Sequence, residues 1–330
     1  MKEFQNIFLE LSPDLKKIDE IILQFSLGKS PLISEVSSHL ISSGGKRIRP
    51  ILLILAAKLC GSKSDDDYLN LAAAVELIHS ATLLHDDVVD ESQVRRGKKT
   101  SNSIWGNKPS ILVGDYLFSI AFQLMVKSQN LSVLDLLAKA SSIMADGEVM
   151  QLENSSNIAL SQEKYLEIIF GKTAVLFAAA CESGALINNR PELENRALRE
   201  FGKNLGIIFQ IVDDILDYSS QEVALGKEIG NDFFESKVTL PAILTYQKSN
   251  PEDKNFIAEI FEKNLLTQNK DQKDFADFLK LIKKYKGFES AKNLALRHQE
   301  LASKNLQIFV DSPAKKYLTN VLQYSLSRIF

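Results

Sequence analysis

The feature that most limits the fold is the stretch LNLAAAVELIHSATLLHDD, residues 69–87. Its apolar residues recur at three- and four-residue spacing and cover most of the circumference of a helix. A helix that is apolar nearly all round is buried inside a bundle. Strand signals are weak in the rest of the chain, which has no convincing alternating run and no Asn-Gly hairpin turn. We therefore expect an all-α protein.

Glycine and proline are scarce, at 15 and 8 of 330 residues. The few places where they cluster therefore predict breaks between helices. The breaks fall near residues 42–45, 61–67, 95–101, 154–161, 188–191, 219–232, 249–254 and 311–314. They divide the chain into roughly a dozen helices joined by short loops, without low complexity or a linker. The sequence thus predicts one all-α domain, residues 1–330.

Composition is that of an ordinary soluble protein, with 45% hydrophobic residues, 25% charged residues and a formal net charge of −3. The chain lacks the basic excess of a general nucleic-acid binder, so no nucleic-acid partner is expected. Cys60 and Cys181 have neither disulfide nor metal-ligand spacing and are expected to be small core residues. The N-terminus is unlike a signal peptide, and no apolar run approaches the length of a bilayer span. We expect a cytoplasmic protein.

Acidic residues occur in two copies of the spacing DDxxD. The copies are Asp86, Asp87 and Asp90 in LLHDDVVDE, and Asp213, Asp214 and Asp217 in FQIVDDILDY. In a helix, positions i and i+4 share one face, and their carboxylates repel each other unless a hard cation such as Mg²⁺ binds them. One copy is explained equally well as a solvated acidic turn. Two copies, each after a long apolar helix, predict Mg²⁺ and a phosphate-bearing substrate in a pocket with carboxylates on both walls, if the helices face each other.

Basic residues stand beside glycines and beside both acidic motifs. The clusters are GGKRIRP (Lys46, Arg47, Arg49), RRGK (Arg95, Arg96), GKT (Lys172, Thr173) and GKEIGNDFFESK (Lys227, Lys237). Arginine suits bidentate phosphate contact, and lysine acts as a point charge. Any one cluster alone is explained by surface salt bridges. Their position beside the acidic motifs indicates phosphate binding.

These motifs resemble those of the trans-polyprenyl diphosphate synthase (isoprenyl diphosphate synthase) family, and its long-chain, octaprenyl- and decaprenyl-like branch in particular. The match runs through GGKRIRP, LLHDDVVDES, RRGK, GDYLFSIAF, DGEVMQLE, GKTAVLFAAACESGA, FQIVDDILDY and GKEIGNDFFESKVTLP, over residues 44–241. The flanks, 1–40 and 242–330, match only in being helical. The resemblance implies an isoprenoid synthase-type bundle of antiparallel helices around a deep central cavity, and a homodimer.

The resemblance also implies an activity, the Mg²⁺-dependent head-to-tail condensation of isopentenyl diphosphate onto an allylic diphosphate such as farnesyl diphosphate. About three Mg²⁺ would be bound by Asp86, Asp87, Asp90, Asp213, Asp214 and Asp217. Contacts to the allylic diphosphate fall to Arg95, Lys172, Lys227 and Lys237, and contacts to isopentenyl diphosphate to Lys46, Arg49, His79 and Arg96. Thr173 and Gln210 take the family's positions next to the reacting carbons. Ser236 departs from the glycine that long-chain relatives usually have before the lysine.

Product length is predicted from Ala81 and Thr82, which lie five and four residues before Asp86. Their side chains are about 6–8 Å down the helix from the metal site. In the family, aromatic residues here accompany short products and small ones long products. We expect an octaprenyl to decaprenyl product for a quinone side chain such as that of ubiquinone. Such an amphiphilic product suggests transient membrane contact. In the alternative interpretation, Ala81 is a packing alanine between helices.

Four other functions are weighed against this one. His85-Asp86 is the pair found in HD metal phosphohydrolases, but that class needs further histidine ligands, and the second DDxxD would go unused. A class I terpene cyclase would not need cations for a second diphosphate. A short-chain farnesyl or geranylgeranyl diphosphate synthase has the same mechanism with a closed cavity. A non-catalytic subunit of a heteromeric synthase would be indicated by loss of one aspartate motif, and both are intact here.

Overall fold

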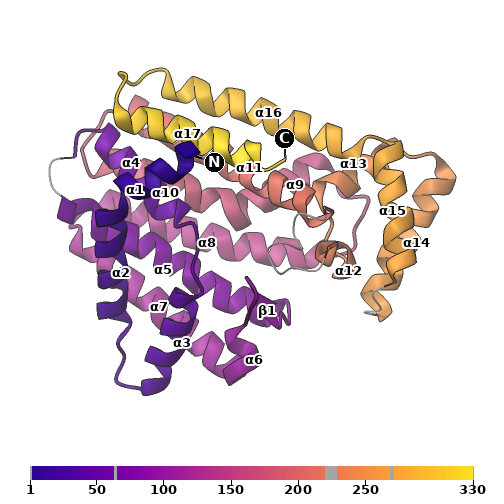
Figure 1. The fold of residues 1–330 in the computed structure, drawn as a ribbon, viewed down its shortest axis with the longest axis horizontal. Coiled ribbons are helices and arrows are strands. Elements are labelled where there is room, and N and C mark those ends of the chain that lie inside the picture. The colour runs from indigo at the N-terminus through magenta and orange to yellow at the C-terminus, as the bar shows by residue number, and fades with distance from the viewer. Residues whose placement is uncertain (1, 63–64, 220–228, 268–270, 330) are drawn as a thin grey trace. The chain divides into compact units, whose positions relative to one another are not determined.

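The computed structural model describes residues 2–62, 65–219, 229–267 and 271–329. Helices dominate these residues (Figure 1), which confirms the predicted all-α class. The helices are α1 (Lys2–Glu10), α2 (Ser12–Ser26), α3 (Pro31–Ser42), α4 (Ile48–Leu59), α5 (Asp65–Val89), α6 (Ser101–Trp105), α7 (Asn107–Lys127), α8 (Leu131–Glu153), α9 (Gln162–Ile169), α10 (Val175–Leu186), α11 (Glu192–Asp217), α12 (Asn231–Phe234), α13 (Leu240–Lys248), α14 (Pro251–Thr267), α15 (Gln272–Lys284), α16 (Gly287–Leu306) and α17 (Pro313–Ser327). The π-helix η1 (Phe170–Ala174) joins α9 to α10. The predicted breaks within the described residues lie at or beside helix ends, and the break at 219–232 extends over residues outside that part of the chain. Further helix ends, such as those between α2 and α3 and between α7 and α8, give the described residues more helices than the dozen expected.

Residue contacts group the chain into two compact units. The first unit comprises residues 1–141, 176–202 and 305–321, and the second comprises 142–175, 203–304 and 322–330. The boundaries fall inside helices, including α8, α11 and α16. The single domain expected from the sequence stays a prediction.

The core of the first unit is built on α5, which packs against α2, α4 and α7 (Figure 1). Residues 71–75 are 0% exposed, so the helix is buried all round over this stretch, as its apolar pattern predicts. Cys60 and Cys181 are free and buried, which agrees with their expected role as core residues. The long, rigid α5 thus carries the first aspartate motif at its C-terminal end.

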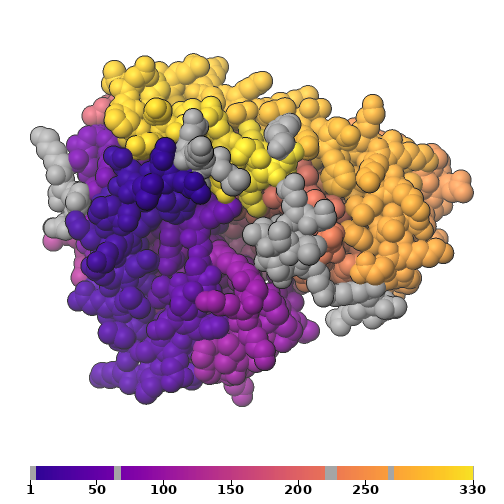
Figure 2. All heavy atoms as spheres, viewed as in Figure 1, coloured from indigo at the N-terminus to yellow at the C-terminus, as the bar shows by residue number. Residues whose placement is uncertain are grey.

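A short hairpin follows α5. Strands β1 (Val94–Arg95) and β2 (Lys98–Lys99) pair antiparallel around a two-residue turn. The turn residues Arg96 and Gly97 have φ of 53° and 74°, as a type I′ turn requires. The sequence predicted only a break here. In the space-filling view, the hairpin and α6 lie beside α3 at the surface of the first unit (Figure 2).

The second unit contains an aromatic cluster that fixes the end of α11. Phe233 and Phe278 stack with ring centroids 5.3 Å apart, and Tyr218 contacts Phe278 at 6.2 Å. The Tyr218 hydroxyl also forms a 2.7 Å hydrogen bond with the Thr239 hydroxyl. Because Tyr218 directly follows Asp217, the cluster holds the second aspartate motif in place.

Two stretches are long and apolar enough to cross a membrane by length and composition alone, residues 107–127 and 162–186. This differs from the expectation that none would approach a bilayer span. The second stretch is 89% buried within the protein and the first 44%. Buried core helices pass the same test, and the second stretch is buried in this way.

Candidate active site

The first aspartate motif divides between two faces at the C-terminal end of α5. Asp86 and Asp90 lie one turn apart and are half-buried, whereas Asp87 is only 2% exposed. Arg95 Nε donates a 2.8 Å hydrogen bond to Asp87 Oδ1. Burial raises the pKa of Asp87, and the Arg95 guanidinium opposes this shift. The geometry therefore separates a partly exposed pair of carboxylates from a buried one that holds Arg95.

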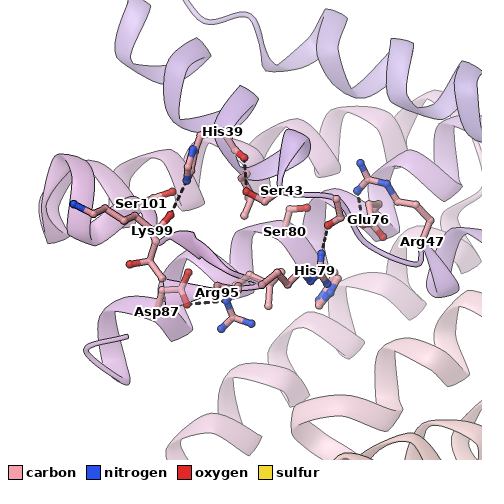
Figure 3. Close-up of a pocket in the computed structure, with 15 residues that line it drawn as sticks. His39, Ser43, Arg47, Glu76, His79, Ser80, Asp87, Arg95, Lys99 and Ser101 are labelled. Carbon is pink, nitrogen blue, oxygen red and sulfur yellow. Dashed lines mark hydrogen bonds and ion pairs between the residues drawn. The ribbon is translucent and has the colours of Figure 1, made fainter. Parts of the chain in front are cut away.

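A pocket lies beside this motif, within the first unit (Figure 3). Its polar lining includes three arginines and two histidines. The lining residues are His39, Leu40, Ser43, Gly44, Arg47, Glu76, His79, Ser80, Leu83, Asp87, Arg95, Arg96, Lys99, Thr100 and Ser101. Of the residues predicted for isopentenyl diphosphate, His79 and Arg96 are therefore brought together with Arg95. Lys46 and Arg49 are not among the lining residues, and the Arg49 guanidinium lies 4.7 Å from the ring centroid of Phe177.

Arg47 has a structural role that sequence reasoning did not assign. Its Nη1 lies 2.6 Å from Glu76 Oε1 (Figure 3), and its Nη2 lies 3.0 Å from Asp19 Oδ1. The residue also has left-handed backbone geometry, with φ of 45°. These ion pairs fix the GGKRIRP loop onto α5 and α2. These ion pairs join residues far apart in the sequence, so the sequence showed only that Arg47 belongs to a basic cluster.

The hairpin RRGK and the adjoining Lys99 hold the loop after α3 over the pocket. Arg96 Nη1 donates to the Gly44 carbonyl, Lys98 Nζ donates to the Ser42 carbonyl at 2.8 Å, and His39 Nε2 lies 2.8 Å from the Lys99 carbonyl oxygen. A Cβ at Gly45 would come 2.7 Å from Arg96 Nη1, so the end of the Arg96 side chain would have to shift. The left-handed conformation of Arg96 thus serves to aim its guanidinium back at the GGKR loop.

The surroundings of His79 favour the neutral form of its imidazole. Burial lowers its pKa well below the ordinary value, and the neighbouring guanidinium groups of Arg49, Arg96 and Arg95 act in the same direction. A neutral imidazole in an arginine-rich pocket can donate or accept one hydrogen bond without adding charge. The net positive charge that would attract a diphosphate therefore comes from the arginines.

The second aspartate motif, at the C-terminal end of α11, has one exposed carboxylate. The Asp213 side chain is 40% exposed, whereas Asp214 and Asp217 are 3% and 6% exposed as residues. Asp217 Oδ2 accepts a 3.1 Å hydrogen bond from the backbone N–H of Asp232. The motif thus places Asp213 where a ligand can reach it and turns the other two carboxylates into the protein.

Asp214 is the centre of a hydrogen-bond network that the sequence did not reveal. Its Oδ2 accepts from the Tyr165 hydroxyl at 2.7 Å and from the Leu240 N–H at 3.1 Å, and its Oδ1 accepts from Gln210 Nε2 at 2.9 Å. Burial raises the pKa of Asp214 to about 7, with the charge of Asp232 acting in the same direction. Gln210 Oε1 in turn accepts a 2.8 Å hydrogen bond from Thr173. The predicted neighbours Thr173 and Gln210 therefore belong to one network with Asp214.

The GKT segment forms the π-helix η1, where the backbone approaches α8 closely. π-Bulges inside α-helices are frequent at functional sites. Gly147 and Gly171 permit the approach, since a Cβ at Gly171 would lie 3.0 Å from the Gly147 Cα. Lys172 Nζ consequently reaches Glu148 Oε2 at 2.8 Å and Gln151 Oε1 at 2.6 Å. Glu148 and Gln151 thus position the lysine.

Replacing Gly147 with alanine is expected to lower both stability and activity. The new Cβ would come 2.5 Å from the Lys172 backbone nitrogen and 2.7 Å from the Gly171 carbonyl carbon, so η1 must move. Overpacking of this kind costs about 1–3 kcal/mol of unfolding free energy. Thermal unfolding and steady-state kinetics measure the two effects. The exposed neighbour Asp146→Ala is the control, and an unchanged melting temperature in Gly147→Ala would contradict the close packing.

Lys237 and Ser236 lie on the turn after α12. Lys237 Nζ pairs with Glu235 Oε2 at 2.9 Å. Ser236 is fully buried with φ of 55°, a left-handed conformation that favours the glycine expected here from the resemblance. Its hydroxyl donates a 3.1 Å hydrogen bond to the Phe261 carbonyl. Lys227, predicted to contact the allylic diphosphate, lies outside the described residues.

The two chain-length residues lie on α5. Ala81 is 0% exposed. Thr82 is half-buried, and its hydroxyl donates a 2.8 Å hydrogen bond to the His79 carbonyl. Both are small, but buried contact is equally expected of a packing alanine. Their effect on product length stays a prediction. That the two aspartate motifs face each other also stays a prediction.

The carboxylates fit Mg²⁺ held jointly with a substrate. Among the residues that the structure describes, no three His, Cys, Asp or Glu side chains converge closely enough to bind a metal ion alone. Mg²⁺ usually keeps several waters and takes one or two carboxylates together with substrate phosphates. Asp86, Asp90 and Asp213, the accessible members of the motifs, supply oxygen ligands of that kind.

Comparison with known proteins identifies the family. The polyprenyl synthetase family model matches residues 30–281. The octaprenyl diphosphate synthase of Haemophilus influenzae is 36% identical over 316 residues, which cover 96% of this chain and 94% of the relative. Similarity therefore extends beyond residues 44–241, to which the sequence motifs had limited it.

Solved structures agree. A decaprenyl diphosphate synthase from Rhodobacter capsulatus has a TM-score of 0.93 at 40% identity, with 99% of both chains covered. A polyprenyl synthase from Caulobacter crescentus, complexed with calcium and isoprenyl diphosphate, has a TM-score of 0.92 at 40% identity, covering 98% of this chain and 97% of its own. These matches confirm the predicted isoprenoid synthase-type fold and the predicted resemblance. The chain belongs to the polyprenyl synthetase family.

Proposed function

We propose that this protein is a long-chain trans-polyprenyl diphosphate synthase, a Mg²⁺-dependent prenyltransferase. It adds isopentenyl diphosphate units head to tail onto an allylic diphosphate such as farnesyl diphosphate. The observation that carries the proposal is the pocket lined by Arg95, Arg96 and His79 directly beside the first aspartate motif. The octaprenyl and decaprenyl names of the relatives support a product of that length, suited to a quinone side chain such as that of ubiquinone.

The aspartates take different roles in this proposal. Asp86, Asp90 and Asp213 bind Mg²⁺ directly because their carboxylates are accessible. Asp87 orients Arg95, and Asp214 holds Gln210. Asp217 is buried, and its carboxylate holds the backbone N–H of Asp232. The proposal includes about three Mg²⁺ per active site, the number that the family resemblance implies.

The reaction breaks the C–O bond of the allylic diphosphate and forms a carbon–carbon bond to isopentenyl diphosphate. Bound Mg²⁺ supplies charge stabilisation to the departing diphosphate. Arg95, Lys172, Lys227 and Lys237 are assigned in this proposal to add positive charge toward the same leaving group. Apolar side chains exclude water, which would otherwise capture the allylic carbocation. The proton lost by the new isoprene unit passes to the departing pyrophosphate.

Isopentenyl diphosphate binds separately from the allylic substrate. Arg96 and His79 lie in the pocket of the first unit and suit its diphosphate. The proposal also assigns Lys46 and Arg49, which do not line this pocket, to the same diphosphate. Both belong to the GGKRIRP segment, which the Arg47 ion pairs hold against α5 and α2. Thr173 and Gln210 lie near the reacting carbons and are held by their mutual 2.8 Å hydrogen bond.

The protein is further proposed to be a homodimer in the cytoplasm. One face of α7 exposes large apolar side chains, namely Ile111, Leu112, Phe122 and Val126 at 42%, 66%, 40% and 61%. Burial of such a face against a second copy removes apolar surface from water. Transient membrane contact would serve release of the amphiphilic product. Light scattering that gives the mass of one chain would contradict the dimer.

The proposed function is tested by product analysis. Purified protein is incubated with Mg²⁺, farnesyl diphosphate and excess isopentenyl diphosphate, and the dephosphorylated alcohols are weighed by mass spectrometry. The expected result is a ladder ending at about eight to ten isoprene units that is abolished by EDTA, because Mg²⁺ is needed at the leaving group. A ladder ending at three or four units would indicate the short-chain alternative. No elongation by folded protein would favour the non-catalytic subunit.

A further inference from the structure

The C-terminal tail, residues 322–329, is fixed against the second aspartate motif within the second unit. The last turns of α17 bury Leu322, Ser325 and Leu326, and Arg328 follows the helix directly. Lys292 on α16 donates a 2.6 Å hydrogen bond to the Ile329 carbonyl. The tail is therefore held on both sides of Arg328, which limits where that side chain can point.

The Arg328 side chain packs against α11, where it contacts Asp213, the first residue of the motif. Its Nη1 is 2.8 Å from Asp213 Oδ1, and its Cζ is 5.3 Å from the ring centroid of Phe209. Phe209 and Asp213 are one helical turn apart and so form a cradle with an aromatic face and a carboxylate. The Arg328 side chain is 16% exposed in this cradle. The guanidinium thus neutralises the most accessible carboxylate of the second motif.

A guanidinium and a magnesium ion cannot share that carboxylate freely. Mg²⁺ needs an oxygen ligand at about 2.0–2.1 Å in an octahedron, and two cations within a few ångströms repel each other. Asp214 is a poorer ligand, because it is buried and its two oxygens already accept three hydrogen bonds from protein donors. Mg²⁺ binding at Asp213 is therefore opposed by the charge of Arg328.

We propose that Arg328 is an internal counter-ion that competes with Mg²⁺ for Asp213, so that metal binding at the second motif releases the C-terminal tail. The inference rests on the proposed function, which assigns Mg²⁺ to Asp213. It extends that function by coupling metal binding to the C-terminal tail. Neither sequence motif nor spacing pointed to Arg328.

The test compares Arg328→Gln with the wild-type protein and with Arg190→Gln. Arg190 is the matched control, because it pairs with Glu194 at 2.6 Å on the first unit and loses the same charge. Mg²⁺ is titrated by calorimetry in the presence of inorganic pyrophosphate. Arg328→Gln is expected to bind Mg²⁺ about fivefold more tightly, the size of a moderate ion-pair term. Arg190→Gln and the charge-preserving Arg328→Lys are expected to match wild type.

Amide hydrogen exchange supplies a second readout. In the wild-type protein, Mg²⁺ with pyrophosphate is expected to increase exchange in residues 322–329, and Asp213→Asn is expected to remove that response. Unchanged or weaker Mg²⁺ binding by Arg328→Gln, in protein that still elongates farnesyl diphosphate, would overturn this inference alone. Absence of both elongation and Mg²⁺ binding in the wild-type protein would overturn the proposed function together with it.

Discussion

Replacing Asp86 with asparagine is expected to slow prenyl transfer by about 10²–10³-fold, the typical loss on removing one preorganised group that stabilises transition-state charge. Asparagine keeps the size and hydrogen-bonding capacity of the side chain but removes its charge, so Mg²⁺ loses a ligand. Asp86 is half-buried at the end of α5 and contributes little to the core. The melting temperature should therefore stay near that of the wild-type protein while kcat falls.

Two further variants make this result specific. Asp135→Asn removes a charge from an exposed i,i+4 pair with Lys139 on α8 and is expected to leave kcat unchanged. Asp87→Asn weakens the hold on Arg95 from a buried position, so it should lower stability as well as kcat. Kinetics at saturating Mg²⁺ and thermal unfolding distinguish the three. Full activity of Asp86→Asn would remove the first motif from the metal site.

Local pattern was sufficient for most helices and failed for the hairpin. The all-round apolar stretch of α5 predicts its own burial, since nothing but a bundle interior can cover it. The hairpin instead needs Arg96 in a left-handed conformation, which is costly for a residue with a Cβ. The hydrogen bond from Arg96 to the Gly44 carbonyl offsets that cost. A contact between residues so far apart in sequence cannot be read from either segment alone.

In the candidate site, too, local helical spacing could be predicted from the sequence, whereas contacts between distant segments could not. Helical spacing places Asp86 and Asp90 on one face, as expected, because it depends only on helix geometry. The partners that hold the other carboxylates come from distant segments, such as Tyr165 for Asp214. The clash that forces glycine at 147 likewise exists only once α8 and η1 are packed together. Residue types that can bind phosphate are visible in sequence, whereas the residues that position them are tertiary in origin.

Product length should respond to Ala81→Phe more strongly than to any other single change in the first unit. Ala81 lies five residues before Asp86, about 7.5 Å along the helix axis, and is fully buried. If the growing chain passes this point, a phenyl ring blocks it. The main product should then fall from about eight to ten isoprene units to about three or four, with turnover of the first condensation retained, because the ring lies about one and a half turns from the metal site.

Ala72→Phe is the matched control for steric effects. Ala72 is also 0% exposed on α5 and lies nine residues earlier, which is about 180° round the helix. Overpacking there should cost about 1–3 kcal/mol of unfolding free energy and leave the product ladder unchanged. Mass spectrometry of the alcohols and thermal unfolding of both variants are measured together. If Ala81→Phe merely destabilises the protein as Ala72→Phe does, Ala81 is a packing alanine and product length is set elsewhere. If it shortens the ladder at wild-type stability, α5 forms the wall of the elongation cavity.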